Sequence, residues 1–318
     1  MAKPRALGTD VEIRGATEST YGAAPGTGYT LLVARAIDLD TERPLGVDEL
    51  IGQGRKAQGA YYERASVAGS ADVPVDVRAI GFWLHGLFGA ATVTDNGDGT
   101  WDHAWSDALS ALPSKAIEIG HPQLATPKFY RYTGCKFGSL SVPFSGNGQA
   151  NAQVQIIGQD RAEAAAPATH DLRIFAQARG AISVGGNPVA LVTAGQLDFT
   201  NTLEAVETIR ADGLIEGIDE GNPRPSGSMT VRFSDAASHE SLRAAIAGET
   251  PVALAYAFTD PAGWSLTFTL PRVLLPAARA PIQGPGGIAQ TFDWQGEYDS
   301  GAGHALGVTL VNDVASYG

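Results

Sequence analysis

The chain has a single cysteine, Cys135, among 318 residues, so neither a disulfide within the chain nor a cysteine-rich zinc site can form. Charged residues are also scarce, at 18% against the usual quarter, which leaves much of the surface small and uncharged. No apolar run is long enough to cross a bilayer, and no secretory signal follows Met1. We therefore expect a soluble protein that is made in a cytoplasm.

Basic residues are few and dispersed. The 22 lysines and arginines face 34 acids, for a formal charge of −12. The excess of acids is larger in residues 164–318 (16 acids, 8 bases) than in residues 1–163 (18 acids, 14 bases). Because duplex DNA binders need clustered Lys and Arg to displace counterions, we expect no tight binding to nucleic acid. Repulsion likewise argues against an anionic membrane as a partner.

What the sequence does contain is an internal repeat of about 150–160 residues. Residues 34–40 (ARAIDLD) resemble residues 194–200 (AGQLDFT), and a Gly-Ser pair follows each, at Gly69-Ser70 and at Gly227-Ser228. With 39 glycines and 18 prolines, the chain is turn-rich, which excludes a coiled coil, a collagen and a disordered tail. The repeat predicts two similar halves.

Each Gly-Ser pair precedes a short helix candidate that ends at a glycine. The first candidate, residues 76–88, has apolar side chains at helical spacing, with Asp76 placed to cap its start and Gly89 placed to end it. The second covers residues 238–247 and ends at Gly248. We expect one short helix in each half.

Strand patterns follow each helix. Apolar and polar residues alternate in residues 266–270 and 290–296, which is typical of half-buried strands. Residues 130–132, 137–142 and 154–158 are the equivalent strands of the first half. The sequence therefore predicts a mainly β protein with two tandem domains. A hairpin over residues 94–106, present only in the first half, would be an insertion.

The expected boundaries are an extended N-terminal arm at residues 1–30, a first domain at 31–163 and a second at 164–318, divided at an alanine-rich linker. Long segments with few strand signals, residues 40–62 and 200–222, occupy corresponding places in the two halves. Long loops of compact domains tend to be functional, and we expect these loops to contact a neighbouring subunit. Their charged residues are the candidate contact sites: Glu42, Arg43, Asp48, Glu49, Arg55, Lys56, Glu204, Glu207, Arg210, Asp212 and Glu216. The alternative is that these loops are merely solvated.

Several motifs suggest binding chemistry, but an ordinary structural explanation fits each better. Residues 95–102 resemble an acidic calcium loop, but Ser106 stands where the pattern needs a glutamate, so we expect a hairpin turn. The glycines at 146–148 and 284–287 are too short a pattern for a dinucleotide site and are interpreted as turns. His85 is interpreted as a packed or surface helix residue rather than a metal ligand.

Cys135 and the tryptophans are the remaining candidates for a reactive or binding site. Lys136 beside Cys135 would lower the pKa of the thiol, although a structural cysteine in a strand is the preferred interpretation. Trp83 and Trp294 are expected in the core, whereas the segment from Trp101 to Trp105 is a candidate exposed platform for a sugar. No nucleophile, base or metal-ligand pattern stands out, so we expect no enzymatic activity, no cofactor and no metal.

The order of these segments resembles the major tail tube proteins of long-tailed (siphovirus-like) bacteriophages. The resemblance is one of pattern and order over most of the chain, without a signature motif, and it is weaker in the first half because of the inserted hairpin. The segments that carry it are residues 18–25, residues 227–233, the helix ending at Gly248, and residues 265–275, 290–297 and 306–312.

The resemblance implies two β-sandwich or half-barrel tube domains, each with one flanking helix, whose inner sheets join neighbours in a barrel around a channel. Such rings stack, and a ring typically holds about six domains, so a duplicated chain would form trimeric, pseudo-hexameric rings. The implied function is that of a structural virion protein of the tail, assembled in the bacterial host cytoplasm, through which the genome is ejected. The implied partners are further copies of the chain, a tape measure protein inside, and terminator and distal tail proteins at the ends.

In this setting the acidic balance would let DNA pass through the lumen without specific binding. Two alternatives stay open on the residues alone. One is a tube subunit of a related injection or secretion machine, and the other is a two-domain β-sandwich that binds carbohydrate or protein.

Overall fold

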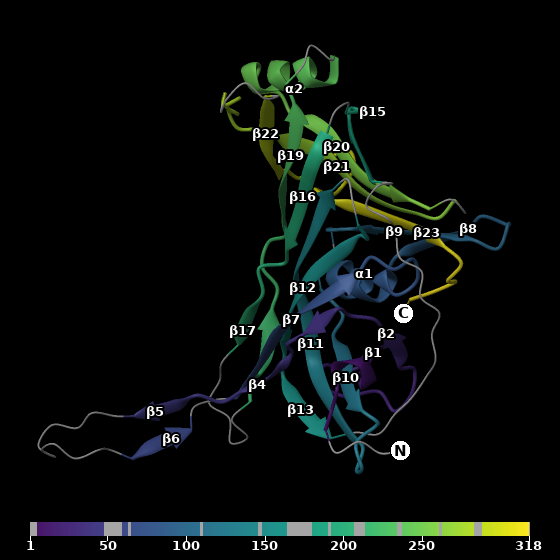
Figure 1. Cartoon of the computed structure of the whole chain (residues 1–318), viewed down its shortest axis with the longest axis vertical. Helices are drawn as coiled ribbons and strands as arrows, with labels where there is room; N and C mark the ends of the chain where they lie inside the picture. The colour runs from purple at the N-terminus through teal and green to yellow at the C-terminus, as the bar shows by residue number, and fades with distance from the viewer. Residues whose placement is uncertain are drawn as a thin grey trace, which may run out of the picture.

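The computed structural model describes residues 5–47, 59–62, 65–108, 111–145, 148–163, 180–189, 192–206, 214–233, 237–260, 263–282 and 288–317. Within these residues the chain is mainly β with one helix in each half, which confirms the fold class predicted from the alternating sequence patterns (Figure 1). Neither of the two described helices has the length and apolar character needed to cross a membrane.

The elements of the first half lie between residues 8 and 163. A short 3-10 turn (Gly8–Asp10) precedes the first strand, and helix α1 spans Ile80–Phe88. The strands are β1 (Glu12–Thr17), β2 (Thr30–Leu32), β3 (Ala36–Ile37), β4 (Asp40–Glu42), β5 (Leu45–Val47), β6 (Ala60–Tyr62), β7 (Ser66–Pro74), β8 (Thr92–Asp95), β9 (Trp101–Ser106), β10 (Lys115–His121), β11 (Lys128–Ser145), β12 (Asn151–Gly158) and β13 (Asp160–Glu163).

The elements of the second half lie between residues 180 and 312, and helix α2 spans Ala237–Ala247. The strands are β14 (Gly180–Val184), β15 (Asn187–Pro188), β16 (Val192–Thr200), β17 (Glu204–Val206), β18 (Gly217–Asp219), β19 (Arg224–Arg232), β20 (Val252–Thr259), β21 (Ser265–Leu274), β22 (Ala289–Gly296) and β23 (Gly307–Asn312).

One antiparallel sheet runs through both halves, and we call it the central sheet. Its strand order is β3/β4, β7, β12, the C-terminal part of β11, β16, β19, β22 and the end of β21. The halves meet where β11 pairs with β16 in a continuous register from Ser139 opposite Thr200 to Ser145 opposite Ala194. The central strands lie along the long axis of the molecule in Figure 1.

Each half adds a side sheet. The first side sheet is β2, β1, β10, the N-terminal part of β11, and β13. The second is β15, β14, β20, the N-terminal part of β21, and β23. Residues 12–17, inside the segment expected to be an extended arm, thus form β1 of the first side sheet.

The strand pairings of the two halves follow the same order. In the first half, β1 pairs with β2 and β10, β11 pairs with β10, β12 and β13, and β7 pairs with β3/β4 and β12. In the second half, β14 pairs with β15 and β20, β21 with β20, β22 and β23, and β19 with β16 and β22. The hairpins β5–β6 and β17–β18 also occupy the same place in this order.

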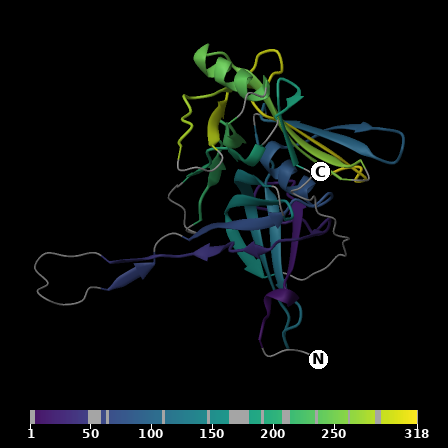
Figure 2. The same cartoon turned by 45° about the horizontal axis from the view of Figure 1, so that its top comes forward.

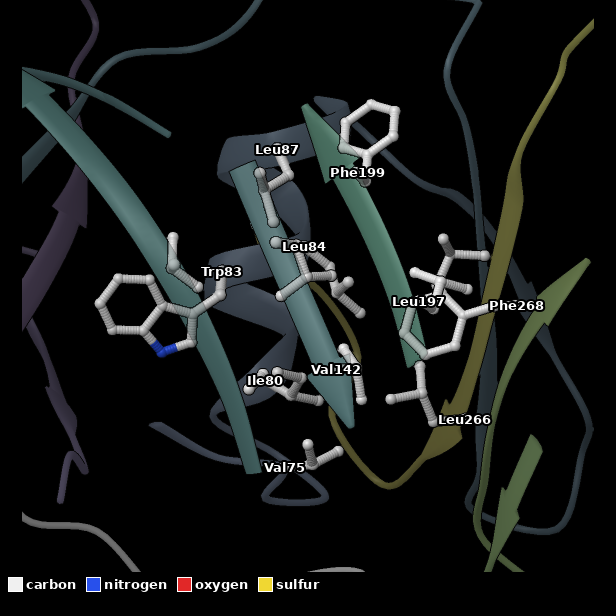
Figure 3. Close-up of a cluster of buried hydrophobic side chains, with 14 of the residues drawn as sticks. Val75, Ile80, Trp83, Leu84, Leu87, Val142, Leu197, Phe199, Leu266 and Phe268 are labelled. Atoms are coloured by element: carbon white, nitrogen blue, oxygen red, sulfur yellow. The ribbon is translucent and has the colours of Figure 1, made fainter. Parts of the chain in front are cut away.

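The core lies between the central sheet and the elements that cover it. Along the central strands buried side chains largely alternate with more exposed ones, as expected for a sheet with one face toward a core. Figure 3 shows Leu84 and Leu87 of α1 in one buried cluster with Val142 of β11 and Phe199 of β16, and Trp83 of α1 belongs to the same cluster. Helix α1 therefore joins the two halves through a shared core.

Helix α1 differs from the sequence prediction at its start. All nine of its residues are buried, so it is buried all round rather than on one stripe. Its helical residues begin at Ile80 instead of Asp76, but the Asp76 carboxylate accepts the backbone N–H groups of Arg78 and Ala79 and thus caps the turn that leads into the helix, as predicted. Gly89 ends the helix with a positive φ of 79°, as expected for a glycine at this position.

The strand registers relate residues 34–40 and 194–200 with an offset of two residues from the alignment expected from the sequence. The residue opposite Gly227 is Leu197, and the register of β3 and β4 on β7 places Leu39 at the level of Gly69. Leu39 therefore corresponds to Leu197. Because side chains alternate with period two, this shift keeps the same faces buried.

Candidate functional site

The exposed face of the central sheet is mainly polar, with a few apolar residues such as Ile157 and Leu274 among the polar ones. Serine, threonine, glutamine and asparagine alternate with the buried residues on β7, β12, β11, β16, β19 and β22. The registers place more acids than bases on this face. The acids are Asp38, Asp40, Glu42, Asp72, Asp198 and Asp293, and the bases are Arg224 and Arg232.

Two further cations at the margins of this face are neutralised. Lys136 forms an ion pair with Glu220 and also donates to the Ile218 carbonyl at 3.1 Å. Arg272 contacts Glu297 at 2.8 Å. The polar face thus carries a net negative charge, and its small hydroxyl and amide side chains provide no cluster of bases for an anion. None of the described residues form a group of three or more His, Cys, Asp or Glu able to hold a metal.

The central sheet is open at both ends. Strands β3 and β4 pair with β7 on one side, and no other described strand pairs with them. At the opposite end, β21 stops at Leu274, and residues 275–282 continue without strand structure. Unpaired strand edges are templates for pairing with another chain. The two ends are therefore candidate assembly surfaces.

At the junction between the halves, a strand edge of this kind is paired within one chain. Beside the β11–β16 pairing, the rings of Phe88 and Phe199 lie 4.7 Å apart. Asn201 donates from its side-chain amide to the carbonyls of Leu87 (3.1 Å) and Phe137 (3.0 Å). The inserted hairpin adds a second connection, because β9 pairs with β23 of the other half.

The hairpin β5–β6 carries the first group of predicted contact residues and projects away from the body (Figures 1 and 2). Glu42 ends β4 and is exposed, and Arg43 stacks over the ring of Tyr62 at 5.1 Å. Asp48, Glu49, Arg55 and Lys56 lie outside the described residues.

The same hairpin also has an exposed apolar side, which the sequence analysis missed. Leu45 lies opposite Tyr62, and Val47 follows two residues later on the same side. These three side chains are 61%, 69% and 55% exposed. Exposed apolar groups on a projecting hairpin mark a contact surface.

The second group lies on the hairpin β17–β18. Glu204 stands opposite Asp219, and Glu216 donates its backbone N–H to the Val206 carbonyl at 2.9 Å. Glu207, Arg210 and Asp212 lie outside the described residues.

Buried charged groups in the first side sheet were not foreseen. Arg14, 1% exposed, pairs with Glu118 at 3.0 Å, and Arg131 contacts the other oxygen of Glu118 at 2.9 Å. Lys115 lies against His85, and burial lowers the pKa of Lys115 to about 7. These groups sit in ordinary strand and helix patterns, so no sequence signal distinguishes them, and their partners are internal.

The turn motif, the tryptophan pair and Cys135, which the sequence analysis considered as possible binding or reactive sites, have structural roles. Residues 95–99 form the turn of the β8–β9 hairpin, where the Asp95 carboxylate accepts the Gly97 N–H. Trp105 is buried and donates to the Gly89 carbonyl, so the expectation of an exposed tryptophan platform is wrong for this residue. Burial raises the pKa of the Cys135 thiol, contrary to the lowering expected from Lys136.

Of the two expectations for His85, a packed or a surface residue, the structure shows the packed one. Its ring is buried, and desolvation together with the Lys115 cation lowers the pKa to about 4. The glycine turns at 146–148 and 284–287 lie largely outside the described residues, so their interpretation stays a prediction.

Comparison with known proteins indicates a protein family for this chain, independently of its fold. The family model described as "Phage tail tube protein" matches residues 8–296, which is most of the chain. A comparison with curated proteins found no match.

Proposed function

We propose that this chain, which belongs to the phage tail tube protein family, builds the tube as closed rings whose polar central sheets line the channel. Family membership makes it a structural protein of the phage tail. The single observation that carries the finer proposal is the central sheet, which is open at both edges, apolar on one face and polar on the other. Closing such sheets into a barrel would pair every edge and point one face inward.

The charge of the polar face supports its placement around DNA. Asp198 and Asp293 lie on it with serine and glutamine neighbours, and its acids outnumber its arginines. At physiological salt, charges act over about 8 Å, so an acidic lining would repel the phosphates of passing DNA near the wall. The genome would then be ejected through the tube without being held.

The shared order of strand pairings supports a ring of three chains. Each half supplies a side sheet and four members of the central sheet in equivalent positions, so the chain contains two copies of one ring-forming unit. Three chains would present about six such units with pseudo-sixfold symmetry. In this proposal, 1–30 is an N-terminal segment that contains β1, and 31–163 and 164–318 are the two tube domains.

The projecting hairpins are the proposed contacts between stacked rings. The apolar side of β5–β6, formed by Leu45, Val47 and Tyr62, would pack against the adjacent ring. The charged candidates of the two hairpins would add ion pairs around it. Those candidates are Glu42, Arg43, Asp48, Glu49, Arg55, Lys56, Glu204, Glu207, Arg210, Asp212 and Glu216.

We infer the place of assembly and the partner proteins from the family. Assembly would take place in the bacterial host cytoplasm, on a tape measure protein inside the tube, with terminator and distal tail proteins at its ends. Electron microscopy of the purified protein, concentrated without partners, tests the proposal. Rings or tubes with an open centre are expected, whereas dispersed monomers at every concentration would contradict self-assembly.

A further inference from the structure

The two copies of the long bent strand end differently. Strand β11 continues to Ser145, and its C-terminal part lies between β12 and β16. Strand β21, its counterpart in the second half, stops at Leu274, where no neighbouring half is present to pair with it. The difference in length therefore coincides with the presence or absence of a partner strand.

The registers align the two strands residue by residue. Ile156 of β12 is opposite Gly69, and Trp294 of β22 is opposite Gly227, so Ile157 corresponds to Gln295. Lys136 pairs with Ile157 and Leu274 pairs with Gln295, so Lys136 corresponds to Leu274.

Counting onward without a gap, Ser139 corresponds to Ala277 and Phe144 to Ile282. The same count places Pro281 level with Pro143, which β11 accommodates while paired with β16. Residues 275–282 are thus the counterpart of a paired strand segment.

The opposite edge aligns in the same way. Because Leu39 corresponds to Leu197, Glu42 at the end of β4 corresponds to Thr200 at the end of β16. Strand β16 is the one that receives β11 in the intrachain junction. In a second copy of the chain, β3 and β4 would receive the counterpart of β11.

We propose that residues 275–282 of one chain become a strand on assembly and pair antiparallel with the β3–β4 edge of the next chain. The intrachain register sets the interchain one: Ala277 opposite Glu42, Arg279 opposite Asp40, and Ile282 opposite Ile37. This proposal rests on the ring proposed above, and it specifies the partner segment and its register.

Charge complementarity supports this register. Arg279 is exposed and makes no hydrogen bond or ion pair with any part of the chain that the structure describes. Opposite it, Asp40 receives Arg161 (2.7 Å), Tyr132 (3.3 Å) and Thr41 (2.7 Å), all on Oδ1. Its Oδ2 is left for a further donor, which an arginine on the facing strand supplies.

Burial supports the register as well. Ile282 is 76% exposed, although its counterpart Phe144 is buried and stacks on Phe258 with ring centroids 4.4 Å apart. Pairing with the next chain would turn Ile282 toward the core beside Ile37. The segment already contacts β22 in the single chain, because the Gln290 side-chain amide donates to the Ala278 carbonyl at 3.2 Å.

Engineered disulfides test the register. Directly opposite residues in an antiparallel pair have Cα atoms about 4.5–5.5 Å apart, within the range of a disulfide. Assembled Ala277→Cys/Glu42→Cys protein should therefore form covalent dimers and trimers on a non-reducing gel. Pro281→Cys/Glu42→Cys is the matched control, since a shift of four residues separates the thiols by about 13 Å. The native Cys135 is buried and does not compete.

The positive control is the intrachain pair Ser139→Cys/Thr200→Cys, which should lose both thiols while the chain still runs as a monomer on the non-reducing gel. Amide exchange supplies a second readout: protection of residues 275–282 should rise on going from monomer to tube. Tubes in which only the Pro281→Cys pair cross-links, or in which this segment exchanges as fast as in the monomer, would overturn the register while leaving the tube function intact. Absence of rings and tubes in the wild type would instead count against the proposed function, and with it this pairing.

Discussion

Removing the side-chain amide of Asn201 should destabilise the junction between the two halves. Asn201 is 6% exposed and donates to two carbonyls, those of Leu87 and Phe137. The first belongs to the last turn of α1, where carbonyls lack helical partners. The second stands at the irregularity of β11, where the register on β12 shifts after Phe137. Both oxygens accept a hydrogen bond from this one amide.

The magnitude follows from the two acceptors. A buried polar atom left without a partner costs about 1–3 kcal/mol, so Asn201→Ala should lower the free energy of unfolding by about 2–4 kcal/mol. Reversible urea unfolding followed by tryptophan fluorescence measures the change. Asn187→Ala is the matched control, because Asn187 is exposed and makes a single turn hydrogen bond to the Gly185 carbonyl, worth less than about 0.5 kcal/mol.

A second variant separates the hydrogen bonds from the packing. In Asn201→Asp, the carboxylate cannot donate to the two carbonyls, but its protonated form can. The folded state should therefore raise the pKa of this carboxyl group, so the variant should gain stability relative to wild type as the pH falls toward about 4. An Asn201→Ala protein within about 0.5 kcal/mol of wild type, or an Asp variant with no such pH dependence, would refute the reasoning.

Three further predictions concern the core, the hairpin and the polar face. Because burial holds the pKa of His85 near 4 while the unfolded ring takes up its proton near 6.5, wild type should lose up to about 3 kcal/mol relative to His85→Gln as the pH falls from 6.5 to 4; parallel curves in urea titrations would contradict this. Leu45→Ser/Val47→Ser should leave rings and the free energy of unfolding unchanged but reduce tube length in electron micrographs; tubes of wild-type length would exclude the apolar side of β5–β6 as a stacking contact. Asp198→Lys/Asp293→Lys tubes should retain duplex DNA in a sedimentation assay at low salt and release it at high salt, whereas equal retention by wild-type tubes would contradict an acidic, non-binding lining.

The elements visible in the sequence are those that local patterns define. Alternation in residues 266–270 predicted β21, and Gly89 predicted the end of α1, because each depends on neighbours within a few residues. The hairpin of residues 94–106 was likewise marked by its turn residues. Its pairing with β23 was not predictable, since no local pattern states which distant strand lies beside it.

The candidate site also has features that the sequence predicts and features that depend on distant strand pairing. The acids at 198 and 293 are visible in the sequence, but their presence on one face depends on the registers of β11 on β16 and of β19 on β22. Burial of Arg14 and Lys115 was missed because each lies in an ordinary strand, and only the facing side chains Glu118 and His85 make its burial tolerable. The two-residue displacement of the repeat was missed because an even shift keeps the same faces buried.

A cryo-EM map of the assembled protein tests the central claim most directly, because it shows both the number of chains in a layer and the face turned to the channel. We expect layers of three chains of 33.0 kDa, about 99 kDa in all, with Asp198 and Asp293 lining an open channel. Layers of six whole chains, or a channel lined by the opposite face of the central sheet, would contradict the account.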